Sequence, residues 1–412
     1  MIYFKHAIIG GGVTAGYAAQ VFADSSPASA KTAIFSQENI PPYERPPLSK
    51  SFLAGKKTAR EVLINEPEFY VENNIKLFLN TRITGVDLQK RQLFTDDDIF
   101  GFEKLLIATG SQLRTFQLPG ADLAGIYYLR QLSDARQIRS EIENAEEAGR
   151  AVVIGGSFIG MEVASVLAQK GLETTLVFPE SRVWEALFTP AMSRFFSGYY
   201  QERGVTILPE AEIDGFTGKN GRVTGIQMKG KKSLPTDFVV AGIGVEPNLE
   251  IFKGTPLQIN EGILVNRFLE TNVPGVYAAG DVAEYRDVVF DKTRRVEHWD
   301  NAFRQGQHAA MVILGKQSVY DEVPYFFSDI FDLSYEFWGD PSAADHVVHR
   351  GDLLDGRFSV WWLKDSELQA AFVMNRPAEE SAVAPDWIRS GVGVDTARLA
   401  DDTQPLQSAA QT

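Results

Sequence analysis

Two segments of the chain share one order of hydrophobic and polar positions. HAIIGGGVTAGYAAQVF (6–22) and AVVIGGSFIGMEVASVL (151–167) each consist of an apolar run, a glycine turn and small and apolar residues at helical spacing. A short apolar run that ends in glycines is typical of a buried strand, and the pattern after it is typical of a helix. Each segment, with the apolar run that follows it, therefore predicts a β-α-β unit.

Further apolar runs end in tight turns, namely EKLLIATGSQ (103–112), DFVVAGIGVEPN (237–248) and PGVYAAGDVA (274–283). Because such runs flank the second β-α-β unit on both sides, we expect that unit to be inserted into the first domain. After about residue 323 the pattern changes to short alternating runs such as RFSVWWLK, which predict an antiparallel sheet. The predicted fold is α/β, with two Rossmann-like dinucleotide-binding domains and a C-terminal α+β domain.

These patterns also predict the domain boundaries. We expect a discontinuous first dinucleotide-binding domain over 1–113 and 243–320, with the second over 114–242. The C-terminal domain is expected over 321–395. The polar composition of residues 396–412 predicts a flexible tail.

Composition narrows the possible chemistry. The 412 residues carry a formal net charge of −14, which argues against a general nucleic-acid binder, since binding to phosphates needs an excess of Lys and Arg. The chain has no cysteine, which excludes thiolate nucleophiles, disulfides and cysteine-bound clusters, so redox chemistry requires a bound organic cofactor. No segment has about 18 uncharged apolar residues and the N-terminus does not resemble a signal peptide. We therefore expect a cytoplasmic protein without membrane insertion.

The first glycine turn matches a pyrophosphate site. Gly10 and Gly12 permit the tight turn and the close approach of the backbone to a pyrophosphate, and the helix N-terminus offers free N–H groups. Ala15 replaces the third glycine of the motif and is small enough for the helix to pack on the strand. Glu38 lies at the end of the next strand, about 20 residues on, where an acid that binds a ribose hydroxyl is expected.

The second turn has the same pattern with one change, since serine replaces the middle glycine. Its residues are Gly155, Gly156, Ser157, Phe158, Ile159 and Gly160. Glu180 again lies at a strand end about 20 residues on. One such motif alone is also compatible with a purely structural glycine turn, but two, each with its acid, indicate two dinucleotide sites. In a chain without cysteine this suggests a flavin and a nicotinamide, with hydride passing to the flavin.

The loop NIPPYERPPLSK (39–50) holds Arg45 and Lys50 among four prolines. Proline fixes φ and restricts the residue before it, so this loop has little conformational freedom. One interpretation is a surface loop with two solvated cations. Its position directly after the first β-α-β unit favours another, in which Lys50 stabilises the negative charge of reduced flavin and Arg45 lies nearer the phosphate or the ring system.

The motifs PYERPPLSK, LLIATG, GIGVEPN, VYAAGDVA and VEHWDNA, in this order, resemble those of a family of flavoprotein reductases. This family includes ferredoxin and rubredoxin reductases, apoptosis-inducing factor and monodehydroascorbate reductase, and the resemblance covers about residues 4–340. The segments GGGVTAGYAA (10–19), VFPESRVWEALFTPAMSRFFSGYY (177–200) and VPYFFSDIFDLSYEFWGD (323–340) resemble the plant-type monodehydroascorbate reductases in particular. The resemblance implies a glutathione-reductase-like fold and an FAD-dependent NAD(P)H oxidoreductase.

The resemblance also implies roles for single residues. The implied FAD contacts are Gly10, Gly12, Glu38, Arg45, Lys50, Thr109, Gly110, Arg130, Gly280, Asp281, Glu297, His298 and Trp299. Those of the nicotinamide cofactor are Gly155, Gly156, Phe158, Ile159, Gly160, Glu180 and Gly244. Lys50 is similar to the family lysine near flavin N5.

Glu162, in GMEVA, would then be the carboxylate partner of Lys50, because a buried lysine needs a counter-charge to stay ionised. The other interpretation of Glu162 is an exposed charge on a helix. Phe327 belongs to an aromatic run that is most often core, but it also suits a cover for the acceptor side of the flavin.

The sequence favours NADH over NADPH, because a carboxylate at Glu180 suits free ribose hydroxyls and repels a 2′-phosphate, although Arg182 lies nearby. Three kinds of acceptor remain. They are a small one-electron acceptor such as monodehydroascorbate or a quinone, a ferredoxin or rubredoxin of an oxygenase system, and a redox-signalling role like that of apoptosis-inducing factor. Local sequence favours the first, whereas the acidic net charge disfavours acidic ferredoxins.

One departure bears on the acceptor. Phe303 stands where the plant-type enzymes have an arginine that is thought to hold the anionic substrate, which puts the ascorbate radical in doubt. Arg304 is adjacent, but neighbouring residues of a helix point about 100° apart.

Overall fold

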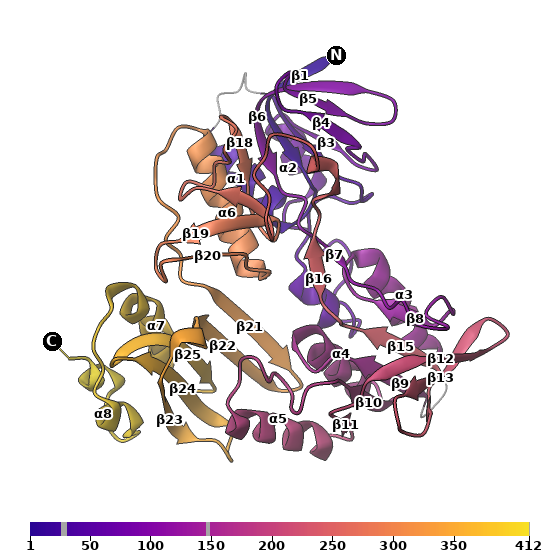
Figure 1. The fold of residues 1–412 in the computed structure, drawn as a ribbon, viewed down its shortest axis with the longest axis vertical. Helices are drawn as coiled ribbons and strands as arrows, with labels where there is room; N and C mark the ends of the chain where they lie inside the picture. Colours follow the sequence, from indigo (N-terminus) through magenta and orange to yellow (C-terminus); the bar gives the residue numbers. More distant parts are fainter. Residues whose placement is uncertain (26–30, 146–148, 412) are drawn as a thin grey trace. The chain divides into compact units, whose positions relative to one another are not determined.

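The computed structural model describes residues 1–25, 31–145 and 149–411. The chain divides into two compact units (Figure 1). Unit 1 comprises Met1–Arg45, Ala59–Gln112 and Val245–Phe326. Unit 2 comprises Pro46–Thr58, Leu113–Gly244 and Phe327–Thr412. The predicted fold class, with two Rossmann-like domains and an antiparallel C-terminal sheet, is confirmed.

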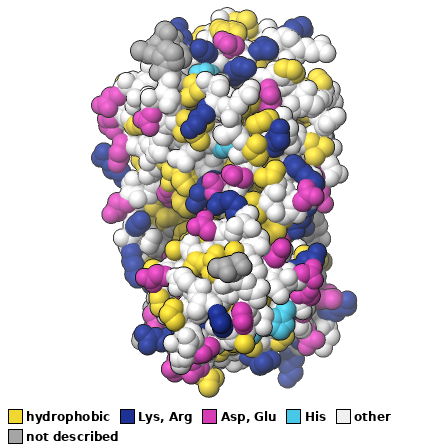
Figure 2. All heavy atoms as spheres, turned by 90° about the vertical axis from the view of Figure 1, so that its left-hand side faces the viewer, with side chains coloured by type: hydrophobic (Ala, Val, Ile, Leu, Met, Phe, Trp, Pro, Cys, Tyr) yellow, Lys and Arg dark blue, Asp and Glu magenta, His cyan; other side chains and the backbone are white. Residues whose placement is uncertain are grey.

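The surface charge is mixed on the face drawn in Figure 2. Among the side chains coloured there, lysines and arginines are interspersed with aspartates and glutamates. The formal net charge of −14 is therefore not gathered into one acidic area on that face.

Unit 1 is built on a sheet in the order β3-β2-β1-β6-β5-β4, with β18 also paired to β6. The strands are β1 (Ile2–Ile9), β2 (Thr32–Phe35), β3 (Ile75–Phe78), β4 (Gly85–Asp87), β5 (Gln92–Phe94), β6 (Ile99–Ile107) and β18 (Val276–Ala278). Strands β3, β2, β1, β6 and β18 pair in parallel, and β5 and β4 continue from β6 in antiparallel pairing. The last three residues of β1 and of β6, and all of β18, are apolar and buried, as buried parallel strands are.

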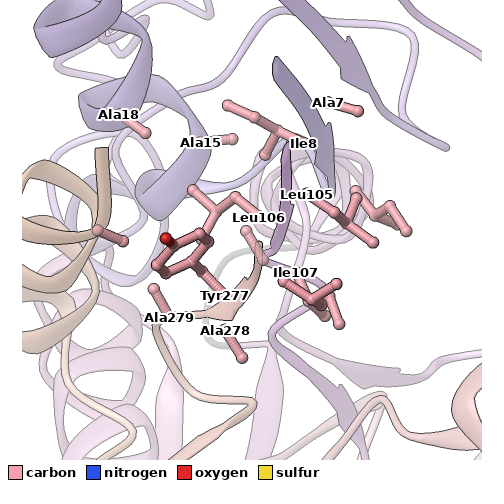
Figure 3. Close-up of a cluster of buried hydrophobic side chains, with 14 of the residues drawn as sticks. Ala7, Ile8, Ala15, Ala18, Leu105, Leu106, Ile107, Tyr277, Ala278 and Ala279 are labelled. Carbon is pink, nitrogen blue, oxygen red and sulfur yellow. The ribbon is translucent and has the colours of Figure 1, made fainter. Parts of the chain in front are cut away.

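Helices α1 (Val13–Ser25) and α6 (Trp299–Ile313) pack against each other beside this sheet (Figure 1). Ala15 and Ala18 of α1 are fully buried, and Figure 3 shows them in a cluster with Ile8 of β1 and Leu106 of β6. Their small side chains let the helix approach the strands closely. The β1-α1-β2 unit predicted from residues 6–22 thus forms as expected.

The remaining elements of unit 1 are short. They are α2 (Pro67–Glu72), β7 (Ser111–Leu113) paired with β16 (Val245–Pro247), η2 (Glu250–Phe252), β17 (Ile263–Val265), β19 (Ala283–Asp287) and β20 (Lys292–Arg294). Strand β19 pairs with both β17 and β20. Apart from α2, they lie between β6 and α6 in the chain, and the turns before β7 and β19 carry the predicted FAD residues Thr109, Gly110, Gly280 and Asp281.

Unit 2 contains a second parallel sheet in the order β11-β10-β9-β15-β8. Its strands are β8 (Ile126–Tyr128), β9 (Arg150–Ile154), β10 (Glu173–Val177), β11 (Thr206–Leu208) and β15 (Phe238–Ala241). The other elements before the C-terminal part are η1 (Pro46–Ser49), α3 (Leu132–Asn144), α4 (Phe158–Gln169), α5 (Pro190–Glu202) and the small sheet of β12 (Ile213–Lys219), β13 (Arg222–Met228) and β14 (Leu234–Pro235). Helix α4 follows β9 through the second glycine turn, as predicted.

The C-terminal sheet has the order β21-β22-β25-β24-β23. Its elements are β21 (Tyr325–Ile330), β22 (Leu333–Gly339), η3 (Pro341–Ala343), β23 (His346–Asp352), β24 (Arg357–Lys364), β25 (Glu367–Met374) and helix α7 (Ala378–Ser390). Strand β24, expected to alternate, is buried from Phe358 to Leu363. The reason is that both faces of the sheet are covered, since α7 packs on β25 and aromatic rings of α5 contact Phe358 and Phe372.

The end of the chain differs from the flexible tail that we expected over 396–412. Residue 412 lies outside the described residues, but the residues before it form α8 (Thr396–Ala400) and η4 (Leu406–Ala409). The buried guanidinium of Arg350 on β23 donates to the carbonyl oxygens of Leu399, Asp401 and Gln404, and to Glu380 of α7. These bonds hold the segment after residue 395 on the domain, although that segment has few apolar residues to bury.

Candidate functional site

The first glycine turn is closed on one side and open on the other. Gly10 has φ 117°, and a Cβ there would lie 2.1 Å from the carbonyl oxygen of Ala108 at the end of β6. A Cβ on Gly12, in contrast, would meet only a guanidinium nitrogen of Arg45, at 3.9 Å. The backbone at Gly12 therefore faces free space at the N-terminus of α1, which fits the close approach of a pyrophosphate.

Glu38 lies just after β2, where its carboxylate has two partners. Its Oε2 accepts a hydrogen bond from the hydroxyl of Tyr43 at 2.7 Å, and its Oε1 lies 3.3 Å from Nη2 of Arg45. A carboxylate has about four lone-pair positions, so Glu38 can still accept from a ribose hydroxyl. The proline-rich loop thus brings Arg45 beside Glu38, and Tyr43 is a partner that the sequence did not single out.

The turn after β6 is held by Asn248. The Asn248 side chain donates to the carbonyl oxygen of Thr109 at 2.9 Å, and its backbone N–H donates to that of Gly110 at 2.9 Å. Thr109 in turn donates its hydroxyl to the carbonyl of Asn248 at 3.1 Å. Gly110 has φ 62°, which favours glycine. Asn248 belongs to the GIGVEPN motif, yet the hydrogen bonds by which it holds this turn were not predicted.

Gly280 and Asp281 lie where β18 ends. Gly280 has φ 77°, and a Cβ there would lie 2.4 Å from the hydroxyl of Thr14, so α1 approaches this turn closely. The buried carboxylate of Asp281 accepts from the hydroxyl of Ser111 at 3.1 Å. The structure thus brings the first turn of α1, the end of β6 and the Gly280–Asp281 turn together.

Two buried donors beside this turn lack partners among the residues that the structure describes. Gln305 accepts from the N–H of Gly280 at 2.8 Å, but its own Nε2 has no hydrogen-bond partner. Arg295 donates through Nη1 to the carbonyl of Asp281 at 3.1 Å, while its buried Nε is unpaired. Because buried polar groups are normally satisfied, these donors fit a bound group rich in oxygen and nitrogen, such as FAD.

The segment Glu297–His298–Trp299 follows. Glu297 pairs with Arg295 at 2.5 Å, and the His298 ring stacks on Phe326 with 4.9 Å between centroids. Burial lowers the pKa of His298 to about 4, with a smaller opposing effect of Asp281, so the imidazole is neutral near pH 7. A pKa this low makes the ring a weak proton acceptor, which agrees with a binding role better than with a general base.

Phe303 lies in an aromatic cluster at the start of α6. Its ring stacks on Trp299 at 5.5 Å with an interplanar angle of 15°, and its centroid lies 4.4 Å from that of Tyr17 of α1. Trp299 and Tyr17 both donate hydrogen bonds to the carboxylate of Glu44, one to each oxygen. Burial, and next the hydrogen bond to Glu44, raises the pKa of Tyr17 above its ordinary value. Glu44 was not predicted to have a role.

The side chain of the neighbouring Arg304 forms ion pairs with two carboxylates. Its Nε donates to Asp300 at 2.7 Å and its Nη1 to Glu322 at 3.1 Å. Asp300 precedes it by one helical turn, so this is an i,i+4 pair. The guanidinium carbon lies 5.9 Å from the centre of the Phe303 ring, but its N–H groups are held by two carboxylates, so it does not stand in for the arginine of the plant-type enzymes.

The second glycine turn brings together glycines from two strand ends. Gly155 has φ 125°, and a Cβ there would lie 2.4 Å from the carbonyl oxygen of Gly242, after β15. A Cβ on Gly160 would lie 1.8 Å from the carbonyl of Gly155, so α4 starts in direct contact with the turn. Ser157 has φ −120°, an ordinary extended value, which explains why serine replaces glycine there. Gly242 is a necessary part of this site that the sequence analysis did not name.

The rest of the second motif lines the start of α4. Gly156 is backed by the ring of Phe178, since a Cβ there would lie 2.6 Å from it. Phe158 begins α4, and Ile159 after it is 39% exposed, an apolar side chain left open to solvent. Gly244 has φ 95° and only Arg114 near its Cβ direction, at 3.9 Å. The exposed positions Ile159 and Gly244 fit a second dinucleotide.

Glu180 is exposed after β10, as expected of a carboxylate that meets a ribose. Arg182, two residues later, does not compete for it. Its Nη1 donates to the carbonyl of Phe188 at 2.6 Å and to Ser193 at 3.0 Å, and its Nη2 donates to the carbonyl of Glu185 at 3.0 Å. The guanidinium thus stabilises the loop before α5 through these hydrogen bonds.

Lys50 and Glu162 form an ion pair within unit 2. The Lys50 Nζ lies 2.7 Å from Oε1 of Glu162, and the side chains are 14% and 4% exposed. Ser49 donates to Oε2 of Glu162, and Ser328 donates to Oε1 at 2.5 Å. The Lys50 Nζ also lies 5.5 Å from the centre of the Phe327 ring. Glu162 is therefore a buried, fully partnered carboxylate and not an exposed helix charge.

The predicted FAD residues fall into both units. Most lie in unit 1, whereas Lys50, Arg130 and Phe327 belong to unit 2. Arg130 lies just before α3, where its backbone N–H donates to the carboxylate of Asp134 at 2.9 Å. The geometry within each unit agrees with the predicted roles, and the assignment of contacts to each cofactor stays a prediction.

Comparison with known proteins agrees with this geometry. The family model described as "Pyridine nucleotide-disulphide oxidoreductase" matches residues 4–306, and the one described as "Reductase C-terminal" matches residues 325–410. Monodehydroascorbate reductase of Solanum lycopersicum is 36% identical over 414 aligned residues, which cover 92% of this chain and 93% of that protein. The protein named monodehydroascorbate reductase 4, peroxisomal, of Arabidopsis thaliana is 37% identical, with 92% and 80% covered.

Solved structures give the same result. Putidaredoxin reductase, in its covalent complex with putidaredoxin, has a TM-score of 0.94 and 30% identity, with 98% of each chain covered. The ferredoxin reductase for the CYP199A2 system from Rhodopseudomonas palustris has a TM-score of 0.93 and 29% identity, with 99% of this chain and 100% of that chain covered.

Proposed function

The chain belongs to the pyridine nucleotide-disulphide oxidoreductase family and is an FAD-dependent NAD(P)H oxidoreductase, and from this premise we propose that it takes electrons from NADH and delivers them singly to a small acceptor of the monodehydroascorbate or quinone type. Bound FAD would supply two-electron uptake and one-electron release. Since a hydride carries two electrons, each NADH reduces two molecules of such an acceptor.

The buried Lys50–Glu162 pair is the observation that carries this proposal. We assign Lys50 the role of a cation that stabilises the anionic reduced state of the flavin, which is most effective where water is excluded. Glu162 is the counter-charge that holds the ammonium in place, at 2.7 Å. A protein that only binds FAD has no need of a buried ion pair, because such a pair contributes little to stability.

The choice of NADH rests on Glu180 and Arg182. An exposed carboxylate after β10 suits the two free hydroxyls of the NADH ribose and repels a 2′-phosphate. Arg182 would be the natural partner for that phosphate, but its guanidinium is bonded to Phe188, Ser193 and Glu185. The bonds of Arg182 therefore support NADH over NADPH.

Within the class of small acceptors, the cluster around Phe303 favours a neutral one. Phe303 is packed between the rings of Trp299 and Tyr17, and Arg304 is held by two carboxylates. This part of α6 thus presents apolar rings where an anionic acceptor would need a cation. A planar, uncharged quinone suits such rings better than the ascorbate radical does.

A small redox protein is the second candidate acceptor. The similarity to putidaredoxin reductase and to the ferredoxin reductase of Rhodopseudomonas palustris favours it. The net charge of −14 weakens the case for an acidic partner, because like charges slow encounter.

No helix within the described ranges is long and apolar enough to cross a membrane. The cytoplasmic location stays a prediction, since one of the relatives is named as peroxisomal.

The proposal is tested by the stoichiometry of electron delivery. The FAD-loaded protein is mixed anaerobically with NADH and a benzoquinone, and NADH loss is compared with one-electron product, detected as its radical by electron paramagnetic resonance. We expect two radical molecules for each NADH at early times. Direct formation of the two-electron hydroquinone without a radical would contradict one-electron delivery.

A further inference from the structure

Strand β21 is tied to helix α4 at two points within unit 2. The hydroxyl of Ser328 donates to Oε1 of Glu162 at 2.5 Å, and the backbone N–H of Phe331, just after β21, donates to the hydroxyl of Ser165 at 3.2 Å. Glu162 and Ser165 are three residues apart and so lie on one face of α4. The C-terminal domain thus contacts α4, and one of its two contacts is made directly with the carboxylate of the ion pair.

The carboxylate of Glu162 depends on these partners. It is 4% exposed, and its described donors are Lys50 and Ser328 on Oε1 and Ser49 on Oε2. A buried charge is tolerated only where such donors replace water. Ser328 is itself fully buried, at 0% exposure, so its hydroxyl is shielded from water where it donates to Glu162.

Ser328 and Lys50 share one oxygen of the carboxylate. Because both bind Oε1, the hydroxyl helps to fix the direction in which that oxygen faces the ammonium. Ser49, the neighbour of Lys50 in the chain, holds the other oxygen. The two hydroxyls therefore hold the carboxylate plane from both ends, one from the proline-rich loop and one from the C-terminal domain.

Backbone strain at the end of β21 shows that the position of this strand is enforced. Phe331 has φ 52°, a left-handed value that costs energy for a bulky residue. It is held there because its ring packs 4.9 Å from that of Tyr200 of α5, while its N–H binds Ser165. The hairpin end is thus fixed to α4 and α5, and Ser328, three residues earlier, is fixed with it.

We propose that Ser328 is a positioning residue for the reductive step, which sets the orientation of the Glu162 carboxylate and through it the ammonium of Lys50. The C-terminal domain thereby completes the ion pair instead of serving only as a structural cap. This inference rests on the proposed function, because the effect on the reaction is transmitted by Lys50. No substrate contact is assigned to Ser328.

The test compares Ser328→Ala with Ser328→Thr, which keeps the hydroxyl. A matched control is Ser334→Ala on the neighbouring strand β22, where the exposed hydroxyl bonds to Asp329 and not to Glu162. Anaerobic stopped-flow reduction of the bound flavin by NADH gives the limiting rate and the apparent Kd separately. We expect Ser328→Ala to lower the limiting rate by about tenfold, the effect of losing one hydrogen bond to a charged group, with Kd unchanged. Ser328→Thr should recover most of the rate, and Ser334→Ala should match the native protein.

A second readout needs no turnover. In urea unfolding, Ser328→Ala and Glu162→Ala should be non-additive in a double-variant cycle, because either variant alone removes the hydrogen bond between hydroxyl and carboxylate. Additive effects, or a native rate of flavin reduction in a folded Ser328→Ala protein, would overturn the inference. Lys50→Ala distinguishes a failure of this inference from a failure of the proposed function. If Lys50→Ala slows reduction and Ser328→Ala does not, only the inference fails, whereas a native rate in Lys50→Ala removes the proposed function on which it rests.

Discussion

Replacing Glu162 by glutamine tests the buried ion pair most sharply. The substitution keeps the shape of the side chain and an oxygen that can accept from Ser49 or Ser328. It removes the charge that lies 2.7 Å from the ammonium of Lys50. Lys50 is then left as a largely buried cation without its counter-charge. We expect the variant to fold with lower stability and to reduce its flavin slowly.

The size of the loss follows from burial. With Lys50 14% and Glu162 4% exposed, water can screen the pair only weakly. Removing one partner of a buried pair costs about 3–5 kcal/mol, because the other charge is left uncompensated. The hydrogen bonds that glutamine retains place the expected value at the lower end, about 3 kcal/mol. This corresponds to roughly a hundredfold change in the unfolding equilibrium.

The assay is urea unfolding of the FAD-loaded protein, followed by far-UV circular dichroism. Glu173→Gln, an exposed glutamate on β10, is the matched control and should change stability by no more than about 0.5 kcal/mol. The double variant Lys50→Met/Glu162→Gln should recover most of the loss, because no charge is then left buried alone. If the double variant is as unstable as the sum of its single variants, the two residues are not coupled and the reasoning is refuted.

Four other consequences can be measured. Lys50→Ala should keep FAD bound yet slow its reduction by NADH in stopped flow, and an unchanged rate would falsify the role of its charge. Glu180→Ala should raise KM for NADH by about tenfold and that for NADPH much less, whereas equal losses speak against a ribose contact. Arg350→Met should lower the free energy of unfolding by about 3 kcal/mol and expose the C-terminus to trypsin, and a tail that stays resistant would show that the arginine is not what holds it. Burial, and then the charge of Lys5, lowers the pKa of His6 to about 4 from 6.5, so its neutral form stabilises the fold above pH 6.5. That stability, about 3 kcal/mol, should be lost as pH falls from 6.5 to 4, and His6→Gln should remove this part of the pH slope.

The glycine turns could be predicted from sequence because their requirements are local. Gly10 and Gly155 need positive φ and close backbone contact, and the apolar runs around them have strand and helix periods. The acids Glu38 and Glu180 follow at a spacing that the β-α-β unit itself imposes. Phe303 could likewise be compared directly with the arginine of the plant-type enzymes.

The partners of the ion pair could not be predicted in this way. Ser49 and Ser328 lie 113 and 166 residues from Glu162, and a serine carries no signal that distinguishes a buried hydroxyl from an exposed one. Gly242 and Asn248 are the first and last residues of the GIGVEPN motif, but their contacts depend on how strands meet. A search for glycines at the end of each predicted strand would have found Gly242.

The end of the chain shows a second reason why sequence did not predict the structure. Its polar composition predicts disorder, yet Arg350 binds backbone carbonyls, which any sequence offers. Strand β24 likewise has the composition of a half-exposed strand and becomes buried on both faces because α7 and α5 cover the sheet. In both cases the deciding contacts are made by distant parts of the chain. The domain boundaries predicted from sequence stay predictions.

The measurement that tests the account most directly is steady-state NADH oxidation at 340 nm by the FAD-loaded protein with different acceptors. A neutral benzoquinone, the enzymatically generated ascorbate radical and a ferredoxin are compared, each with the native protein and with Phe303→Arg. We expect the highest kcat/KM for the quinone with the native protein, and a shift toward the ascorbate radical when the arginine is introduced. Rapid reduction of the ferredoxin with slow turnover of both small acceptors would contradict it and assign the protein to a chain of redox proteins.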